Sequence, residues 1–140
     1  MNIVINGRTK DKLVKVQQNI VQSGGKCEIF PGDASLEETH KQLVDYAIQQ
    51  YGSLHIALNN SGTSKPGKLI DYKSSDLDLI IDINIKGVVY GLKYQLAAMS
   101  KYTSVAEPGV IINVSSTAAI TESQATAGSG IYGATKYVVL

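Results

Sequence analysis

Residues 54–62 read LHIALNNSG, a short apolar run that ends in a cluster of small polar residues. The run from Leu54 to Leu58 has the length of a β-strand and is bounded by turn-forming residues on both sides. In an open parallel sheet, ligands bind beyond the carboxyl ends of the strands. The stretch therefore predicts a strand with a candidate binding loop, residues 59–62, directly after it.

Helical periodicity flanks this strand on both sides. Apolar residues recur at helical spacing over 36–51, and Gly52 is placed to end that helix. Ser35 and Glu38 match a capping box, which predicts that the helix starts there. On the other side, the pattern predicts one long apolar helix over about 76–102.

The rest of the chain repeats the alternation of strand and helix. Further strands are expected at 3–5, 26–30 and 110–114, and further helices after Thr9 and from near Ile131 onward. The continuous apolar run at 110–114, broken only by Asn113, is typical of a strand covered on both faces. The sequence thus predicts one α/β domain built on a parallel sheet.

Composition excludes several classes of protein. The 140 residues suffice for one domain, and the 44% hydrophobic content suffices for a core without disulfides. A net charge of +1 argues against a protein that binds nucleic acid by neutralising phosphates. Cys27 is the only cysteine, and neither His40 nor His55 has metal-ligand spacing, so no metal is expected. The apolar runs are far shorter than the ~20 residues of a membrane span, and the first residues lack the features of a secretory signal, which predicts a soluble cytoplasmic protein.

Tyr132 and Lys136 are the first candidates for chemistry. They lie four residues apart at the start of the last expected helix, and therefore on one face of it. A phenol with a reference pKa near ~10 is a poor base at neutral pH, but a nearby ammonium favours the phenolate. Such a pair can act as general acid or base on a carbonyl or an alcohol. An ordinary exposed pair on a helix is the competing interpretation.

Two further side chains fit the same chemistry. Ser116 follows the strand at 110–114 and can donate a hydrogen bond to the substrate oxygen, whereas Ser115 is expected to be structural. Asn84 lies in the middle of the long apolar helix and must hydrogen-bond a partner there, for which a water is one option.

The ordered set of motifs resembles the short-chain dehydrogenase/reductase family. Residues 59–62 (Asn-Asn-Ser-Gly) resemble its N-N-A-G motif with Ser in place of Ala, and Asn84 resembles its helix asparagine. Residues 113–116 (Asn-Val-Ser-Ser) resemble its serine motif, and residues 132–136 resemble its Y-x-x-x-K. The resemblance implies a Rossmann-like doubly wound parallel sheet. It also implies an oxidoreductase that transfers a hydride between a nicotinamide cofactor and a small carbonyl or alcohol substrate.

The resemblance implies a role for each catalytic candidate. Tyr132 would be the acid or base, and Lys136 would favour its ionised form and bind the nicotinamide ribose. Ser116 would orient the substrate oxygen, and Asn84 would hold a water of a proton relay. A homo-oligomer is also implied, because relatives use the helix equivalent to 76–102 as a subunit interface.

Cofactor contacts are implied at other strand ends. Asn60 and Gly62 would border the cofactor, and Asp33 would contact its adenine. Relatives that prefer NAD tend to carry an acidic residue after the strand equivalent to 3–5, where this chain has Arg8. A guanidinium suits a 2′-phosphate, so NADP is favoured over NAD. A turn residue for Asp33 and a solvated surface charge for Arg8 are the alternatives.

The resemblance also implies elements that these residues do not contain. The family's first strand and glycine-rich turn would precede residue 2, and further elements would follow the last helix. We therefore expect residues 1–140 to be a single partial NAD(P)-binding domain, a fragment that is inactive alone. Its sheet would be either gapped or closed by direct pairing of the strands at 3–5 and 54–58. The alternative is a non-catalytic remnant that acts as an interaction partner of a full-length reductase.

Overall fold

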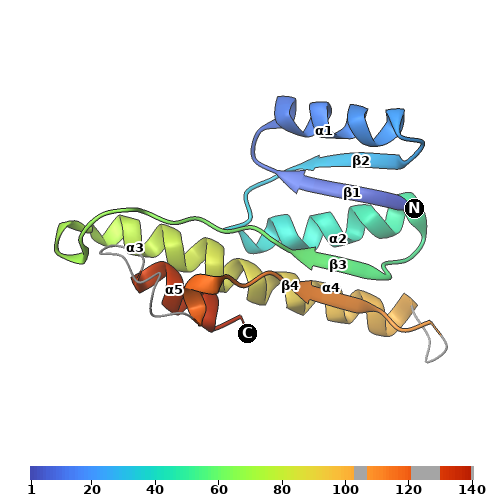
Figure 1. Ribbon diagram of the computed structural model, residues 1–140. Helices are drawn as coiled ribbons and strands as arrows, with labels where there is room; N and C mark the ends of the chain where they lie inside the picture. Colours follow the sequence, from blue (N-terminus) through green and yellow to red (C-terminus); the bar gives the residue numbers. More distant parts are fainter. Residues whose placement is uncertain (103–106, 121–129, 140) are drawn as a thin grey trace.

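Figure 1 shows the computed structural model of the chain, which describes residues 1–102, 107–120 and 130–139. The strands of this described part are β1 (Asn2–Gly7), β2 (Lys26–Pro31), β3 (Ile56–Asn59) and β4 (Val110–Asn113). Its α-helices are α1 (Lys10–Gln22), α2 (Glu37–Tyr51), α3 (Ser74–Ile81), α4 (Gly87–Tyr102) and α5 (Gly130–Tyr137). Short turns of other helix types are η1 (Leu69–Asp71), η2 (Asp82–Lys86) and η3 (Thr117–Ala119). Strand and helix therefore alternate as the sequence predicts.

The strands form two parallel pairs. β1 pairs with β2, and β3 pairs with β4 with Ile56 opposite Val110 and Asn59 opposite Asn113. All four arrows in Figure 1 point the same way, so the carboxyl ends of the strands lie at one edge. Among the described residues, β1 and β3 share no ladder of hydrogen bonds. Of the two arrangements expected from the sequence, the structure shows the gap.

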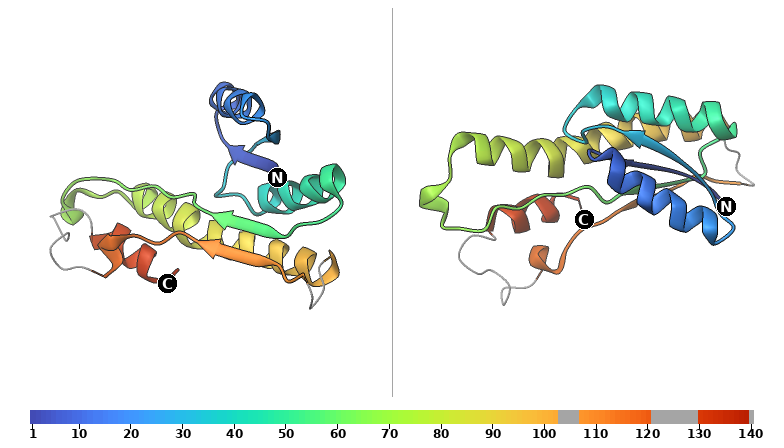
Figure 2. Two further views of the ribbon diagram at one scale, coloured as in Figure 1. Left: turned by 45° about the vertical axis from the view of Figure 1, so that its right-hand side comes forward. Right: turned by 90° about the horizontal axis from the view of Figure 1, so that it is seen from above.

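Helix packing joins the two strand pairs. α2 packs against α4, α2 also contacts β1, and α4 contacts both β3 and β4 (Figure 2). Glu37 at the start of α2 accepts hydrogen bonds from Lys93 Nζ at 2.7 Å and from the Tyr94 hydroxyl at 2.9 Å. The rings of His40 and Tyr90 lie 6.2 Å apart between centroids. The placement of one pair relative to the other therefore depends on this helix contact.

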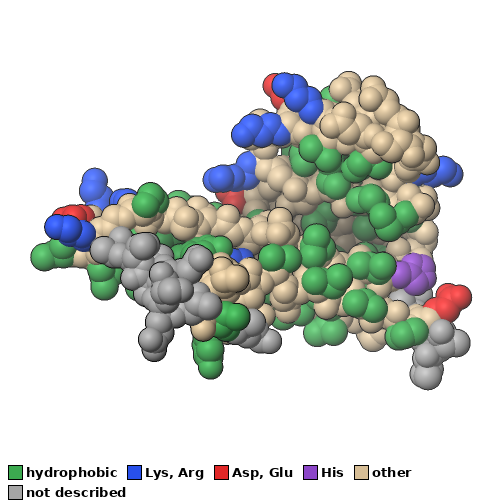
Figure 3. All heavy atoms as spheres, in the orientation of Figure 1, with side chains coloured by type: hydrophobic (Ala, Val, Ile, Leu, Met, Phe, Trp, Pro, Cys, Tyr) green, Lys and Arg blue, Asp and Glu red, His purple; other side chains and the backbone are tan. Residues whose placement is uncertain are grey.

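α4 covers one face of the β3–β4 pair. Ala57 on that face is buried, and the helix contributes buried apolar side chains, among them Val88, Ala98 and Met99. The opposite face carries side chains that are about half exposed: Ile56, Leu58, Val110 and Ile112. Figure 3 shows hydrophobic side chains gathered over this face. The core of this half of the molecule thus lies between α4 and the inner face of the two strands.

The sequence predicts the end of α2 correctly but not its start. Gly52 ends the helix in the left-handed conformation at φ +81°, which a glycine adopts without strain. The capping box predicted at Ser35 and Glu38 is wrong, because α2 begins at Glu37. Ser35 is instead held in a turn by Asp33, whose Oδ1 accepts hydrogen bonds from both its N–H and its hydroxyl at 2.9 Å.

The predicted long helix is confirmed, with one local change in its winding. α3, η2 and α4 follow one another directly over 74–102. The segment η2 is a π-helical turn, in which the N–H of Gly87 bonds to the carbonyl of Asp82 five residues earlier. Such turns insert one extra residue into a helix and are frequent at functional sites. Asn84 lies at the centre of this turn.

Gly87→Ala is expected to destabilise the fold, because α4 starts against the backbone of the loop after β2. A Cβ at Gly87 would lie 2.6 Å from the Ala34 carbonyl oxygen. Overpacking of this kind costs about 1–3 kcal/mol in the free energy of unfolding, which urea denaturation measures. Gly130→Ala is the control, since a Cβ there has nothing within 4 Å. Equal stability of the two variants would contradict the close contact at Gly87.

Candidate active site

The carboxyl ends of β3 and β4 meet α5 around a cavity of about 200 Å³. The two strands run in parallel, so the loops that follow them leave the sheet side by side. The lining residues come from these loops and from α5: Asn60, Gly62, Thr63, Ser64, Val114, Ser115, Tyr132 and Lys136. The structure therefore brings Asn60, Gly62, Tyr132 and Lys136, all predicted from the sequence, to one cavity.

Lys136 is a buried cation with no carboxylate partner in the described part of the chain. It is 3% exposed, and its Nζ donates a hydrogen bond to the Val114 carbonyl at 2.8 Å. A buried charge is costly unless it is paired or hydrogen-bonded, and an ammonium has three N–H groups to satisfy. The cavity therefore contains a positive charge that can bind an anion or hydroxyl groups.

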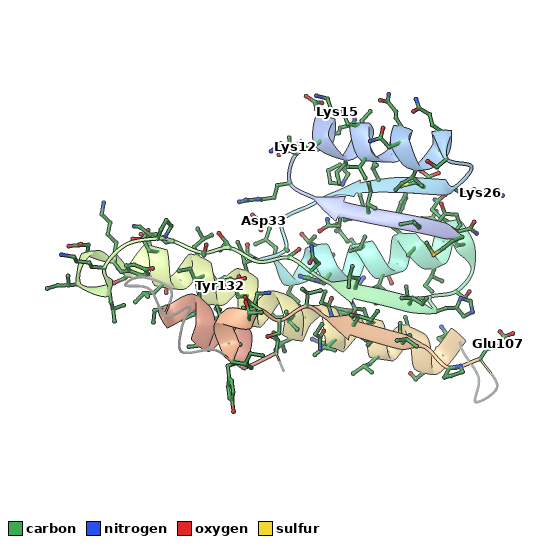
Figure 4. All side chains as sticks on the ribbon, viewed as in Figure 1. Lys12, Lys15, Lys26, Asp33, Glu107 and Tyr132 are labelled. Atoms are coloured by element: carbon green, nitrogen blue, oxygen red, sulfur yellow. The ribbon has the colours of Figure 1, made fainter. Side chains whose placement is uncertain are left out.

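Tyr132 stands one helical turn before Lys136 on α5. Tyr132 lines the same cavity and is partly buried; Figure 4 labels it on α5. The backbone carbonyl of Tyr132 accepts a hydrogen bond from the Thr135 hydroxyl at 2.8 Å, which is a bond within the helix. The phenol and the ammonium thus reach the cavity from one face of one helix, as their spacing predicts.

Asn84 is fully buried and ties three segments together. Its Oδ1 accepts a hydrogen bond from the Thr63 N–H at 2.8 Å. Its Nδ2 donates to the Thr63 carbonyl and to the Thr135 hydroxyl, both at 2.9 Å. The π-helical turn therefore presents an amide that holds the loop after β3 against α5. Within the described chain, both N–H groups of the amide are used, and one lone pair of Oδ1 has no hydrogen bond.

Gly62 keeps the space beside the ammonium open. A Cβ at this position would lie 3.3 Å from Lys136 Nζ and 3.6 Å from Asn84 Oδ1. The first of these distances is tighter than ordinary van der Waals contact, so a side chain at Gly62 would press on the charged group. The predicted role of this glycine as a border of the cofactor is compatible with that geometry.

The two adjacent serines have different surroundings. Ser115 lines the cavity, and its hydroxyl donates to the backbone carbonyl of Lys136 at 2.6 Å. The hydroxyl of Ser116 accepts a hydrogen bond from the Ala118 N–H at 3.2 Å and caps η3. Ser116 is not among the lining residues of the cavity, and its role toward a substrate stays a prediction. Residues 121–129 of the loop predicted after it lie outside the described residues.

Arg8 and Asp33 lie at the carboxyl ends of the other strand pair, away from the cavity. The N–H of Ser35 is the main cause that lowers the pKa of Asp33; burial opposes it, and the Ser35 hydroxyl and the Arg8 charge lower it further. Figure 4 shows Asp33 beside the start of the loop after β2. The two residues are close enough to interact electrostatically, but they are not in the group around Tyr132.

Sequence reasoning missed several polar contacts of the site. Thr63 and Thr135 are the partners of Asn84, and Gln95 of α4 bonds to Asn59 at the end of β3. The only signal for Gln95 was its place among apolar residues of the long helix, and nothing in the sequence names its partner. In the part of the chain that the structure describes, no group of side chains fits a metal ion, and no helix is long and apolar enough to cross a membrane.

Asp33→Asn is expected to flatten the pH dependence of stability in acid. The folded protein lowers the pKa of Asp33, so the carboxylate contributes stability above its unfolded pKa of about 3.9, and this is lost as pH falls through the lower folded value. Melting temperatures measured between about pH 5 and pH 2 should therefore fall less steeply in the variant. Ser35→Ala keeps the backbone N–H bond and should give an intermediate slope. An unchanged slope in Asp33→Asn would rule out this contribution.

Comparison with known proteins matches the whole chain to one family model. A model described as short chain dehydrogenase matches residues 1–140. An uncharacterized oxidoreductase of Staphylococcus aureus (strain MRSA252) is 36% identical over 137 residues, which cover 98% of this chain and 55% of the relative. The chain thus spans about half the length of this curated relative.

Solved structures show the same fold. A short chain dehydrogenase/reductase from Burkholderia phymatum in complex with NAD superposes with a TM-score of 0.88 at 22% identity, over 99% of this chain and 47% of that one. A structure described as ElxO with NADP bound has a TM-score of 0.81 at 25% identity, over 99% of this chain and 53% of that one. The Rossmann-like α/β fold expected from the sequence is therefore confirmed.

Proposed function

The chain belongs to the short-chain dehydrogenase family, and we propose that the cavity beyond β3 and β4 is the proton-transfer site of an NADP(H)-dependent oxidoreductase. One observation carries the proposal. The buried ammonium of Lys136, without a carboxylate partner among the described residues, lies one helical turn from the phenol of Tyr132 in the same cavity. A lysine is almost never fully buried unless its charge is paired, so a buried ammonium that lines a cavity marks a candidate functional site.

The residues present fit a nicotinamide cofactor. Gly62 leaves open the space beside Lys136 Nζ, and among the described residues this ammonium uses one N–H group, which leaves two to bind ribose hydroxyls. Asn60 borders the same space. Arg8 is exposed at the end of β1 and can bind a 2′-phosphate through its planar guanidinium. When bound, the cofactor supplies or accepts the hydride of the reaction.

The side chains of the cavity move the proton. In the direction of reduction, the Tyr132 hydroxyl gives its proton to the carbonyl oxygen as the carbonyl carbon gains the hydride, which yields the alcohol. The Lys136 ammonium stabilises the phenolate that remains. Ser116 lies outside the lining residues; its hydroxyl accepts from the Ala118 N–H and retains a hydrogen, which it donates to the same substrate oxygen so that the carbonyl is polarised. In the direction of oxidation, the phenolate takes the proton back from the alcohol.

Asn84 acts by holding the site together. Its amide fixes the loop at Thr63 and the α5 residue next to Lys136. The remaining lone pair of Oδ1 is available to a water, which would connect Tyr132 and Lys136 to solvent and replace the transferred proton. For the complete protein, we propose a small carbonyl compound or the corresponding alcohol as the substrate. We also propose that the complete protein is a homo-oligomer in the cytoplasm.

Tyr132→Phe in the complete protein is expected to lower kcat at least about a hundredfold, because the variant has no proton to give. A panel of aldehydes and ketones, followed by NADPH absorbance, measures this loss. The dissociation constant for NADPH should change little, because the ring remains. Tyr137→Phe is the matched control on the same helix, since Tyr137 is 66% exposed. Full activity in Tyr132→Phe would refute the proposed role.

Arg8→Ala is expected to weaken NADPH binding about ten- to a hundredfold and to leave NADH binding unchanged. A charge-assisted hydrogen bond is worth about 1.5–3 kcal/mol, and each ~1.4 kcal/mol is tenfold in affinity. Lys15→Ala, on an exposed face of α1, controls for a general loss of positive charge. Fluorescence titration with the two nucleotides gives both constants. Equal affinity of the unaltered protein for NADH and NADPH would contradict the preference for NADP.

A further inference from the structure

A cluster of three side-chain amides, of which Gln95 is buried and Asn59 and Asn113 are partly buried, lies at the carboxyl ends of β3 and β4. Asn59 Nδ2 donates to Gln95 Oε1 at 3.0 Å and to Asn113 Oδ1 at 2.9 Å. Gln95 Nε2 donates back to Asn59 Oδ1 at 2.7 Å. Gln95 is 8% exposed, and its neighbours Ala98 and Met99 on α4 are buried and apolar.

The backbone of α4 is shaped to admit this cluster. A Cβ at Gly91 would lie 2.7 Å from Asn59 Oδ1 and 3.2 Å from Gln95 Nε2. The helix therefore approaches the strand ends closely only because this position carries no side chain. Both N–H groups of Asn59 and its Oδ1 are engaged, so the bonds fix one orientation of the amide.

Two hydrogen bonds lead from the cluster to the charged group of the site. The backbone carbonyl of Asn59 accepts a hydrogen bond from the Val114 N–H at 3.0 Å, one residue beyond the end of β4. The carbonyl of Val114 accepts the hydrogen bond from Lys136 Nζ at 2.8 Å. Val114, whose carbonyl anchors the ammonium, is thus held through its N–H by Asn59, the partner of Gln95.

We propose that Gln95 is a positioning residue of this site, which fixes the ends of β3 and β4 so that the Val114 carbonyl holds the Lys136 ammonium beside Tyr132. The inference rests on the function proposed above. A buried amide is costly unless it is fully hydrogen-bonded, and an apolar residue would pack on α4 at lower cost. The positioning role explains why this buried amide lies on α4 opposite the strand ends and not elsewhere along the helix.

Gln95→Met removes the amide but keeps the length of the side chain, and the complete protein with this change is the test. Gln17→Met is the matched control, since Gln17 Nε2 donates to the Cys27 carbonyl at 2.6 Å in the other half of the molecule. Both variants should lose a few degrees of Tm, because Gln95→Met loses two partly buried hydrogen bonds to Asn59 and Gln17→Met loses one to Cys27. If Gln95 had only a structural role, Gln95→Met would change Tm and leave the second readout, described next, unchanged.

The second readout is the ionisation of Tyr132, followed by NMR of ring-¹³C-labelled tyrosine and assigned by the signal lost in Tyr132→Phe. We expect Gln95→Met to move the midpoint of this ionisation upward, because a displaced ammonium stabilises the phenolate less. Gln17→Met should not move it. Asn113→Ala, which leaves the pair of Gln95 and Asn59 intact, should give a smaller shift in the same direction and serves if Gln95→Met fails to fold.

The outcomes separate the two proposals. If Lys136→Met raises the midpoint but Gln95→Met and Asn113→Ala leave it where Gln17→Met does, the positioning role is overturned and the proposed function stands. If Lys136→Met also leaves the midpoint unchanged, the pairing of phenol and ammonium is wrong, and both proposals fail. A shift in Gln95→Met and in Lys136→Met, with none in Gln17→Met, supports both.

Discussion

The hydrogen bond from Lys136 Nζ to the Val114 carbonyl is the interaction on which the candidate site depends. It joins the last helix to the residue after the last strand, where the carbonyl is released from the sheet while the N–H still bonds to Asn59. A buried ammonium without a carboxylate among the described residues needs such dipoles to be tolerated. Two other features of the site lie next to this charge. Asn84 bonds to Thr135, the residue before Lys136, and Gly62 leaves space beside Lys136 Nζ.

Much of this arrangement was predictable from the sequence, because its signals are local. Apolar periodicity located the helices, and Gly52 marked the end of α2. The rule that polar loops follow parallel strands placed Asn60 and Gly62 at the functional edge, and the spacing of Tyr132 and Lys136 put them on one helical face. The structure shows these residues around one cavity, while their chemical roles stay predictions.

The remaining features depend on contacts between segments far apart in the chain. The helix predicted through Asn84 contains a π-helical turn, and the Asn84 amide in this turn is held by Thr63 and Thr135 from two other segments. Ser35 fits a capping pattern, yet its hydroxyl donates to the carboxylate of Asp33 and does not cap the helix. The partners of Gln95 likewise follow from how α4 crosses the strand ends. A one-dimensional pattern has no information on which of several possible partners a polar side chain will meet.

The described strands form two pairs, and each pair holds a different group of candidate residues. Arg8 and Asp33 belong to the half built on β1 and β2, whereas Tyr132 and Lys136 contact the half built on β3 and β4. In the described part of the chain, the two halves are joined through the contact of α2 with α4 and not by a shared ladder. This one helix interface sets the distance between the ends of β1 and β2 and the cavity at α5, so a change in the packing of Glu37 against Lys93 and Tyr94 would move the two groups of candidate residues relative to each other.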